Sequence, residues 1–431
     1  MTDMNLIAGL DIGNGYVKGR AGAFGVKPTN IDLPSNVAVI TTSHNIETPD
    51  DKVPEVIADI FNEMDASFES KMVRETKRRL FGRRGVRAGG YIEQFSVSNN
   101  HQSKAKQDLS AVLTLGCLAG KALQDYYERN KKLPDENEII QLRCRVALAL
   151  PIAEYIEYRA EFANNYRQGS HMVTIHNFKH PVRFQVIFDD VQVVAEGAAA
   201  QYAIVDGGEP LMGSLLNDLR KMESVMPGIT KRLEKITPAI LLGAKHTCGV
   251  DIGEGTVNFP VMDGLSLNPD ISTSMDKGYG VVLNEALARL KRSNYPFTSR
   301  KQLTEFLNGG PNPFNEELYS TVQHIVDEEI DGFASEIEMQ FRSVIGTYGV
   351  GLELVYVFGG GATSMRNKLY PMLLKALSDF GGVGMSGPVL YLDSRYSRNL
   401  NRNGLYILAD KLAKRLAASA AQPAVDQAPA K

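Results

Sequence analysis

The sequence predicts an α/β protein of two lobes, each a mixed sheet with helices. Residues 6–12 form a short apolar run that ends in an acidic residue and two glycines, the pattern of a buried strand entering a tight turn. The same pattern returns at 247–256, so each half of the chain carries one copy. A third apolar run, 352–358, ends at three consecutive glycines. Stretches with helical spacing of apolar residues separate these strands and complete the α/β alternation.

The 431 residues are enough for two or three domains. We expect a first domain over residues 1–197, with a basic insertion at about 41–110, and a second domain over 198–394. Residues 395–416 are predicted to form a helix that returns to the first domain. Residues 417–431 are rich in Ala, Pro and Gln with almost no large apolar side chain, which predicts a disordered tail.

Composition excludes several classes of protein. The net charge of -3 gives no overall attraction to nucleic acid or anionic membrane. Cys117, Cys144 and Cys248 are too far apart for a CxxC motif and odd in number for a disulfide framework, which favours a reducing compartment. No basic leader precedes the first apolar run, and no run approaches the roughly 18 apolar residues that would span a bilayer. We therefore expect a cytoplasmic protein with no membrane segment.

A basic stretch lies between residues 64 and 90. It could contact DNA phosphates, but in a slightly acidic protein an exposed loop or a contact between subunits is the better interpretation. We therefore expect no direct DNA binding. The basic residues are Lys71, Arg74, Lys77, Arg78, Arg79, Arg83, Arg84 and Arg87.

Two other features are set aside. Residues 116–122 resemble a P-loop but are one residue short and lack the Ser or Thr that would hold Mg²⁺, so we interpret them as helix packing. His171, His176 and His180 show no metal-ligand spacing, and we expect them at the surface.

The first chemical motif is the predicted hairpin at 11–18. Gly13 and Gly15, on either side of Asn14, let backbone N–H groups approach phosphate oxygens without a Cβ in the way. Asp11 can hold the water shell of a metal ion, and Lys18 can reach back as a point charge. The alternative is a plain structural turn, since many hairpins carry Asp and Gly.

The second motif repeats the first. Asp251 is followed by a turn that again carries spaced glycines. Two such hairpins, one from each lobe, could hold one polyphosphate and its Mg²⁺ from opposite sides. The turn residues of this copy are Gly253, Glu254, Gly255 and Thr256.

The third motif is the triple-glycine turn Gly359, Gly360 and Gly361, followed by Ala362 and a helix. Such a turn lets a nucleoside or an α-phosphate lie against bare backbone. Taken alone, a tight connection between strand and helix explains it equally well.

The order of these motifs resembles the actin, Hsp70 and sugar-kinase ATPase superfamily. Within it the chain most resembles ParM-like (StbA-type) plasmid-segregation actins, on the evidence of residues 150–155, 191–200 and 358–363. The resemblance implies an actin-like fold that binds ATP, with GTP as the alternative, together with Mg²⁺ in the cleft between the lobes.

The resemblance also implies roles for individual residues. Asp11 and Asp251 would organise Mg²⁺, through water, and Glu196 would orient the water that attacks the γ-phosphate. The alternative for Glu196 is an acid favoured by the dipole at a helix N-terminus. Asn258 lies either near this water or on the strand surface as a plain amide. Gly13, Asn14, Gly15 and Lys18 would lie on the β-phosphate side.

The implied function is ATP-dependent assembly into a helical filament that hydrolysis destabilises. The implied partner is an adaptor protein bound to a centromere-like site on plasmid DNA. A small-molecule kinase or a chaperone-like ATPase of the same superfamily is an alternative, although no sugar-binding motif is evident. A membrane-associated actin would use the apolar spacing of 405–416, which packing on the first lobe explains more simply.

Overall fold

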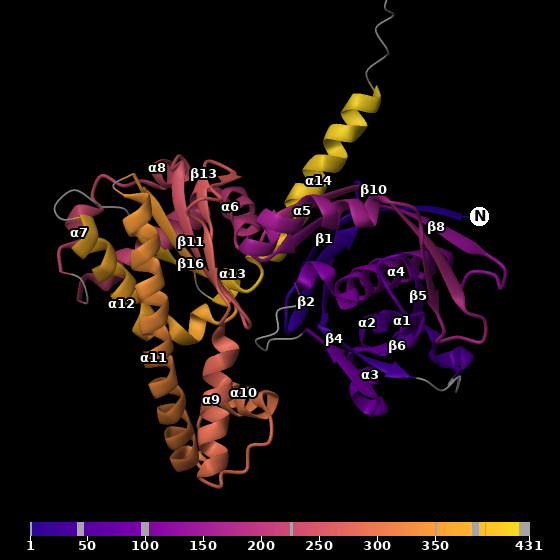
Figure 1. Ribbon diagram of the computed structural model, residues 1–431, viewed down its shortest axis with the longest axis horizontal. Helices are drawn as coiled ribbons and strands as arrows, with labels where there is room; N and C mark the ends of the chain where they lie inside the picture. Colours follow the sequence, from indigo (N-terminus) through magenta and orange to yellow (C-terminus); the bar gives the residue numbers. More distant parts are fainter. Residues whose placement is uncertain are drawn as a thin grey trace, which may run out of the picture. The chain divides into compact units, whose positions relative to one another are not determined.

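The computed structural model describes residues 2–40, 47–95, 103–224, 227–349, 351–381, 388–392 and 394–421. The chain forms two compact units (Figure 1). Unit 1 contains Met1–Leu150, Tyr158–Val194 and Arg402–Lys431, and unit 2 contains Pro151–Glu157 and Ala195–Asn401.

The described strands of unit 1 form a ten-stranded sheet. Their order in the sheet is β3-β2-β1-β8-β10-β9-β5-β6-β4-β7. The central strand β1 (Thr2–Ile12) pairs antiparallel with β2 (Tyr16–Gly22) and parallel with β8 (Ile139–Leu150). The last seven residues of β8 are nearly all buried, as expected of a central strand between neighbours on both sides. The other strands are β3 (Thr29–Pro34), β4 (Asn36–Ile40), β5 (Asp65–Glu69), β6 (Arg78–Phe81), β7 (Tyr91–Gln94), β9 (His171–Ile175) and β10 (Val182–Ala195).

Helix α4 (Asp108–Asn130) packs on this sheet through a face that carries two glycines. A Cβ on Gly116 would lie 2.6 Å from the ring of Phe81, and one on Gly120 would lie 2.8 Å from Met64. The prediction of helix packing for the P-loop-like segment is therefore confirmed, because these glycines admit neighbouring side chains. The remaining helices of unit 1 are α1 (Val53–Ala58), α2 (Ile60–Glu63) and α3 (Gly82–Ala88), while α5 (Ile152–Arg167) begins in unit 2 and continues in unit 1 from Tyr158.

The C-terminal helix α14 (Leu400–Ala421) packs on β1 inside unit 1. A Cβ on Gly9 would lie only 2.2 Å from the backbone nitrogen of Tyr406, so the helix backbone touches the strand directly. The helix continues beyond residue 416, where the sequence led us to expect a disordered tail, because an alanine-rich run has high helix propensity. Residues 422–431 of the predicted tail lie outside the described residues.

Only the first part of the basic stretch, residues 70–77 with Lys71, Arg74 and Lys77, is the exposed loop expected from sequence; the remainder corrects that expectation. It contains strand β6 and helix α3, and its arginines pair with carboxylates distant in sequence. Arg79 is 2% exposed and its Nε donates to Glu93 at 2.9 Å. The Nε of Arg78 donates to the buried Asp65 at 2.9 Å. Most of the positive charge seen in the sequence is therefore neutralised within unit 1.

The histidine prediction is wrong for His171. This side chain is 1% exposed, and its ring nitrogens bond to the Ser70 hydroxyl at 2.8 Å and to the Tyr166 carbonyl at 2.9 Å. His176 is half-buried and bonds to Ser67. Burial lowers the pKa of both imidazoles below the ordinary value.

Unit 2 has a second sheet, in which β11 (His246–Ile252) is central. It pairs antiparallel with β12 (Val257–Phe259) and β13 (Val261–Asp263) and parallel with β16 (Leu354–Phe358). All five side chains of β16 are buried, as in a strand covered on both faces. The short strands β14 (Ser266–Leu267), β15 (Thr273–Met275) and β17 (Val389–Tyr391) complete it.

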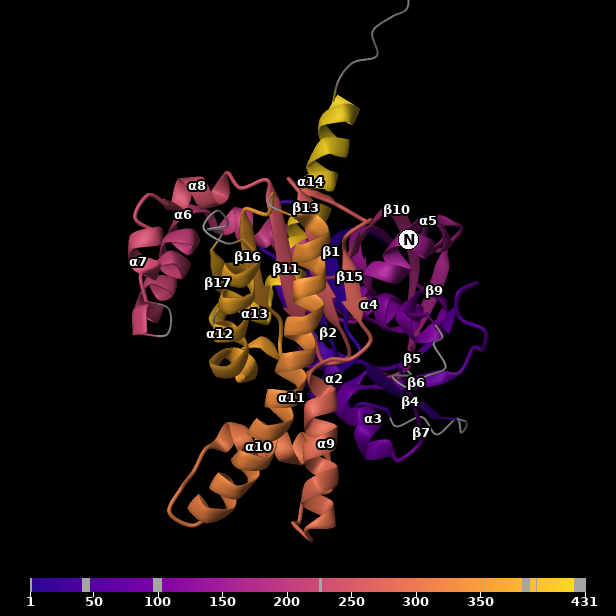
Figure 2. The same ribbon diagram turned by 60° about the vertical axis from the view of Figure 1, so that its left-hand side comes forward.

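The helices of unit 2 include a long pair that extends away from the sheet. Helices α9 (Tyr279–Arg292) and α11 (Glu316–Tyr348) run side by side, with α10 (Arg300–Gly309) against them (Figure 1 and Figure 2). Helix α6 (Ala198–Arg220) is kinked at Gly208, just before Pro210. The others are α7 (Ile229–Arg232), α8 (Pro238–Leu242), α12 (Ala362–Gly381) and α13 (Ser394–Ser397). In the described part of the chain, no helix combines the length and apolarity needed to cross a bilayer.

The buried His171 predicts a pH dependence of folding. Its native pKa lies below the unfolded value of about 6.5, so the unfolded chain binds the proton first as the pH falls. The free energy of unfolding should therefore decrease from about pH 7.5 towards 5.5 and level off below the native pKa. Urea titrations across this range measure the slope. His171→Gln should reduce the slope, leaving the part due to His176. An unchanged slope in this variant would contradict the prediction.

Candidate functional site

The hairpin of unit 1 places an aspartate and a lysine next to each other on neighbouring strands. Asp11 on β1 lies directly opposite Lys18 on β2, so the two side chains share one face of the sheet. The turn between them closes through a bond from the Gly13 N–H to the Tyr16 carbonyl, at 3.1 Å. A Cβ on Gly13 would lie 2.8 Å from that carbonyl oxygen, so the turn favours glycine here. Residues 13–15 are half-exposed at the tip.

The hairpin of unit 2 repeats this geometry. Asp251 on β11 lies directly opposite Asn258 on β12, and the Gly253 N–H donates to the Thr256 carbonyl at 2.9 Å. The predicted repeat is thus present as structure, with the same register and the same turn bond. The difference is chemical: the position of Lys18 in the first copy is taken by the amide Asn258 in the second.

The tip of the second hairpin also accepts hydrogen bonds from the first residues of helix α9. The carbonyls of Gly253 and Glu254 accept from the N–H groups of Tyr279 and Gly280, both at 2.9 Å. The Glu254 carboxylate pairs with Arg300 at 3.1 Å. This side chain is therefore tied to unit 2, and the contribution of Glu254 to any phosphate would come from its backbone.

Asn258 links the second hairpin to Glu196. Its Nδ2 lies 3.4 Å from Oε2 of Glu196 and 3.3 Å from the Thr256 hydroxyl, and its Oδ1 accepts from Ser274 at 2.7 Å. Glu196 is 8% exposed and directly precedes Gly197, which has a φ of 79° at the start of α6. Sequence reasoning left Asn258 open between the two interpretations; in the structure it holds the carboxylate predicted to be catalytic.

The triple-glycine turn packs against Asp251. Gly359 has a φ of 105°, and a Cβ there would lie 2.6 Å from Oδ1 of Asp251 and 2.5 Å from the Ile252 carbonyl. A Cβ on Gly361 would lie 2.6 Å from Tyr279, whereas one on Gly360 would meet nothing within 4 Å. Of the three glycines, only Gly360 therefore borders open space. The close contacts at Gly359 and Gly361 leave no room for a side chain. Ala362 is the first residue of α12.

Two residues of this site were missed by sequence reasoning. The amide Nδ2 of Asn401 donates to Oδ2 of Asp251 at 2.8 Å, and the Ser397 hydroxyl donates to the Gly359 carbonyl at 2.9 Å. Asn401 lies 150 residues from Asp251, and it follows no motif that would mark it. An amide near the start of the last helix gives no signal in a single sequence.

The donor set of unit 2 fits a Mg²⁺ ion held through water. Within the described residues there is no group of three or more His, Cys, Asp or Glu side chains that could enclose a metal. Mg²⁺ does not need one, because it retains several waters and takes one or two carboxylates together with substrate phosphates. Asp251 is 5% exposed and is fixed by Asn401, so it can serve as such a carboxylate.

The predicted residues therefore fall into two sets. Unit 1 holds Asp11, Gly13, Asn14, Gly15 and Lys18, and unit 2 brings Glu196, Asp251, the second hairpin and the triple-glycine turn together. Each set forms a connected structure within its unit.

Comparison with known proteins identifies the fold. Residues 9–198 match the family model described as the N-terminal domain of actin-like proteins. A sequence search of curated proteins gives no significant match.

Solved structures match over nearly the full length. The actin-like protein Alp7A has a TM-score of 0.60 at 16% identity, covering 98% of this chain and 100% of that one. A ParM from a 15-stranded Clostridium botulinum filament has a TM-score of 0.55 at 14% identity, covering 95% and 100%. Bacillus thuringiensis ParM with ATP has a TM-score of 0.54 at 15% identity, covering 95% and 99%.

The solved structures show that the chain has an actin-like fold, and residues 9–198 are similar to the N-terminal domain of actin-like proteins. The predicted actin-like fold is confirmed. The resemblance to ParM-type actins predicted from sequence is confirmed as well, at the level of the fold.

The different surroundings of the glycines give a matched test. Gly359→Ala places a Cβ against the backbone of Ile252 at a positive φ, so it should destabilise unit 2 by about 2 kcal/mol or more. Gly360→Ala adds the same methyl group to open space and should stay within about 0.5 kcal/mol of the wild type. Chemical denaturation followed by circular dichroism measures both. Equal losses in the two variants would show that the packing at Gly359 is not the constraint.

Proposed function

We propose that this chain is an ATP-dependent, polymerising actin-like protein that segregates plasmid DNA and hydrolyses the nucleotide bound by its two hairpins. The observation that carries the proposal is the repeated acid-glycine hairpin, whose second copy joins Asp251, Asn258 and Glu196 into one hydrogen-bonded cluster. An actin-like fold supports it, since its structural neighbours include a ParM with ATP and a ParM filament.

In the proposed site, Asp251 and Asp11 would hold Mg²⁺ through its waters, and the ion would neutralise phosphate charge when bound. Lys18 would act on the phosphates as a point charge, and the N–H groups of Gly13, Asn14 and Gly15 would donate to their oxygens. Gly360 offers bare backbone to the nucleotide. The chain would accept ATP, with GTP as the alternative that nucleotide titration decides.

Glu196 is the proposed catalytic carboxylate. Its Oε2 is near the Nδ2 of Asn258, which Ser274 fixes from the other side, so the carboxylate has a defined orientation. Phosphoryl transfer needs an aligned water more than a strong base, and a fixed carboxylate supplies that alignment.

The proposed product of assembly is a helical filament built by a head-to-tail contact that does not close. The proposed partner is an adaptor protein bound to centromere-like DNA, which captures filament ends. We assign DNA contact to the adaptor because the arginines of residues 78–87 pair with carboxylates of this chain. We place the protein in the cytoplasm, in agreement with three free, buried cysteines.

Glu196→Ala should separate assembly from hydrolysis. With ATP and Mg²⁺, wild-type protein should scatter light, pellet, and then disassemble as phosphate is released. The variant should assemble and persist, with phosphate release lowered by about 10² or more. Parallel samples with GTP, ADP and no nucleotide define the preference. Glu209→Ala, at an exposed position on α6, is the matched control and should behave as wild type.

Other outcomes would refute this function. Protein that stays soluble with every nucleotide but transfers phosphate to a small acceptor would be a kinase of the same superfamily. Calorimetry that detects no Mg²⁺-dependent binding of nucleotide would refute the proposed site itself.

A further inference from the structure

Asn401 carries a buried oxygen that has no hydrogen-bond partner in the protein. Among the described residues, six buried side-chain nitrogen or oxygen atoms make no hydrogen bond. Three of them are the Nε atoms of arginines, which have other N–H groups, and two are hydroxyls, whose hydrogen can rotate. The sixth is Oδ1 of Asn401, the carbonyl oxygen of an amide. A buried acceptor without a partner is costly, so native proteins usually satisfy it with water or a ligand.

The orientation of this amide is set by Asp251. Nδ2 of Asn401 donates to Oδ2 of Asp251 at 2.8 Å. If the amide were rotated by half a turn, Oδ1 would face the carboxylate oxygen, and two acceptors would be in contact. Because Oδ1 and Nδ2 are bonded to the same carbon, Oδ1 lies beside the carboxylate that Nδ2 contacts. The unpaired oxygen therefore belongs to the same place in the structure as Asp251.

The backbone that carries Asn401 is held in place. Asn401 is the second residue of α14, a helix of 22 residues. The segment before it is anchored to the triple-glycine turn, because the Ser397 hydroxyl donates to the Gly359 carbonyl at 2.9 Å. In the same segment the Asn399 N–H donates to the Tyr396 carbonyl at 3.1 Å. A side chain on such a support presents its oxygen in a fixed position, so a ligand there is bound with little loss of conformational entropy.

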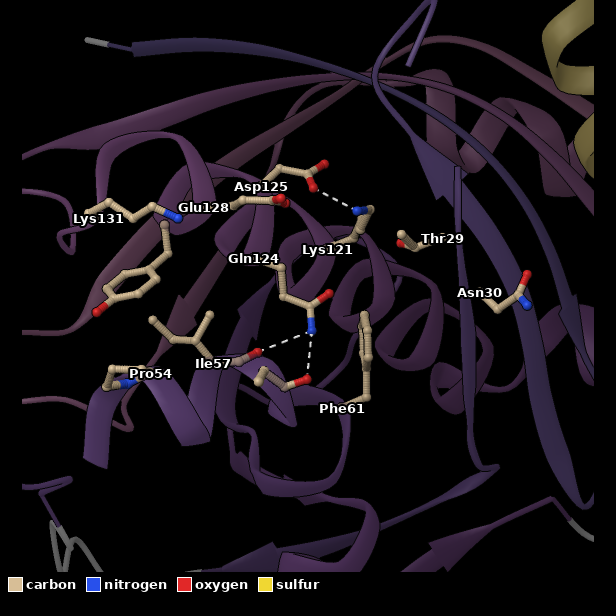
Figure 3. Close-up of a pocket in the computed structure, with 12 residues that line it drawn as sticks. Thr29, Asn30, Pro54, Ile57, Phe61, Lys121, Gln124, Asp125, Glu128 and Lys131 are labelled. Atoms are coloured by element: carbon tan, nitrogen blue, oxygen red, sulfur yellow. Dashed lines mark hydrogen bonds and ion pairs between the residues drawn. The ribbon is translucent and has the colours of Figure 1, made fainter. Parts of the chain in front are cut away.

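The depression between α1 and α4 in unit 1 provides a contrast. Its volume is about 510 Å³, and it is lined mostly by polar and charged side chains (Figure 3). Nζ of Lys121 pairs with Asp125 at 2.6 Å, and Nε2 of Gln124 donates to the carbonyls of Ile57 and Ala58, both at 3.1 Å. None of the six unpaired atoms found in the described residues belongs to a residue that lines it. Its polar side chains are satisfied within the chain, whereas that of Asn401 is not.

A water molecule of Mg²⁺ is the ligand that suits the unpaired oxygen. Mg²⁺ retains several of its waters when a protein binds it. The oxygen of such a water faces the ion, so the water can only donate hydrogen bonds and its partners must be acceptors. Asp251 and Oδ1 of Asn401 provide acceptors next to each other. A set of this kind holds the ion through water, in agreement with the lack of an enclosing group of His, Cys, Asp or Glu among the described residues.

We propose that Asn401 is a positioning residue of the Mg²⁺ site, which fixes Asp251 through Nδ2 and accepts a hydrogen bond from a Mg²⁺-bound water through Oδ1. The inference rests on the proposed function and adds to its site a residue that no motif marks. The amide, and not Asp251 alone, then determines how tightly the chain binds Mg²⁺ together with the nucleotide. Groups that orient the ligands of a metal typically change its affinity about 10- to 100-fold.

Two substitutions separate the two ends of the amide. Asn401→Leu removes both the donor and the acceptor with little change in size, and should lower the affinity for ATP in Mg²⁺ about tenfold or more. Asn401→Asp keeps an oxygen in place of Oδ1 and should bind ATP in Mg²⁺ about as tightly as the wild type. Neither change should alter the affinity for ATP in EDTA. Isothermal titration calorimetry measures all of these affinities.

Asn403→Leu is the matched control. It makes the same substitution at a half-buried asparagine two residues further along α14. Its affinity for ATP should equal that of the wild type both in Mg²⁺ and in EDTA. Circular dichroism of all three variants shows whether each is folded.

Thermal unfolding gives a readout that does not depend on hydrolysis. Asn401→Asp places a second carboxylate next to Asp251, so at neutral pH the metal-free variant should melt at a lower temperature than the wild type. Mg²⁺ with ADP should raise the melting temperature of this variant more than that of the wild type, because the cation offsets the repulsion. An equal rise in both proteins would contradict a Mg²⁺ site beside Asn401.

The outcomes separate this inference from the proposed function. If the wild type binds ATP with Mg²⁺ and Asn401→Leu binds it equally well, the role of Asn401 is wrong and the function stands. If Asn401→Asp loses tenfold in affinity, Asn401 acts only through its bond to Asp251, and the assignment of Oδ1 is overturned; this holds even where Asn401→Leu fails to fold. A wild type that shows no Mg²⁺-dependent binding of nucleotide overturns both the function and the inference.

Discussion

The arrangement of unit 2 depends on one carboxylate that lies where little water reaches it. Asp251 is 5% exposed, and a buried polar group is costly unless hydrogen-bond partners satisfy it. Asn401 supplies one donor to Oδ2, and the turn at Gly359 approaches Oδ1 so closely that any side chain there would collide with it. The start of α6 is also close, since a Cβ on Gly197, which has a φ of 79°, would lie 3.2 Å from the Asp251 Cβ. The glycines at both places follow from this crowding.

The two hairpins show how one local structure can carry two different tasks. Both place a residue opposite the aspartate in the same register, and both close with the same backbone bond. In unit 1 that residue is Lys18, a cation suited to phosphate. In unit 2 it is Asn258, which is neutral and contacts the carboxylate of Glu196. A lysine at that position would pair with Glu196 and compete with a water for its oxygens.

Local pattern was enough to predict strands β1, β11 and β16, the two hairpin turns and the helix that contains Gly116, because each depends on residues close in sequence. Local pattern failed where the contacts of a residue are made with residues that are not its neighbours in the sequence. The burial of Arg79 depends on Glu93, and that of His171 depends on Ser70. Asn401 was missed for the same reason. The triple glycine shows a subtler limit: its three residues are identical in sequence, yet Gly360 alone borders open space because β11 and α9 pack against the other two.

The cluster around Asp251 also lies next to the covalent connections between the units. Glu196 follows the passage from unit 1 to unit 2 between Val194 and Ala195, and Asn401 immediately precedes the return to unit 1 at Arg402. Asn401 contacts Asp251 directly, and Glu196 contacts Asn258, which lies opposite Asp251 in the hairpin. A displacement of Asp251 must therefore either break these contacts or move the two segments. Close packing favours the second outcome, because a closely packed interior transmits strain to its neighbours.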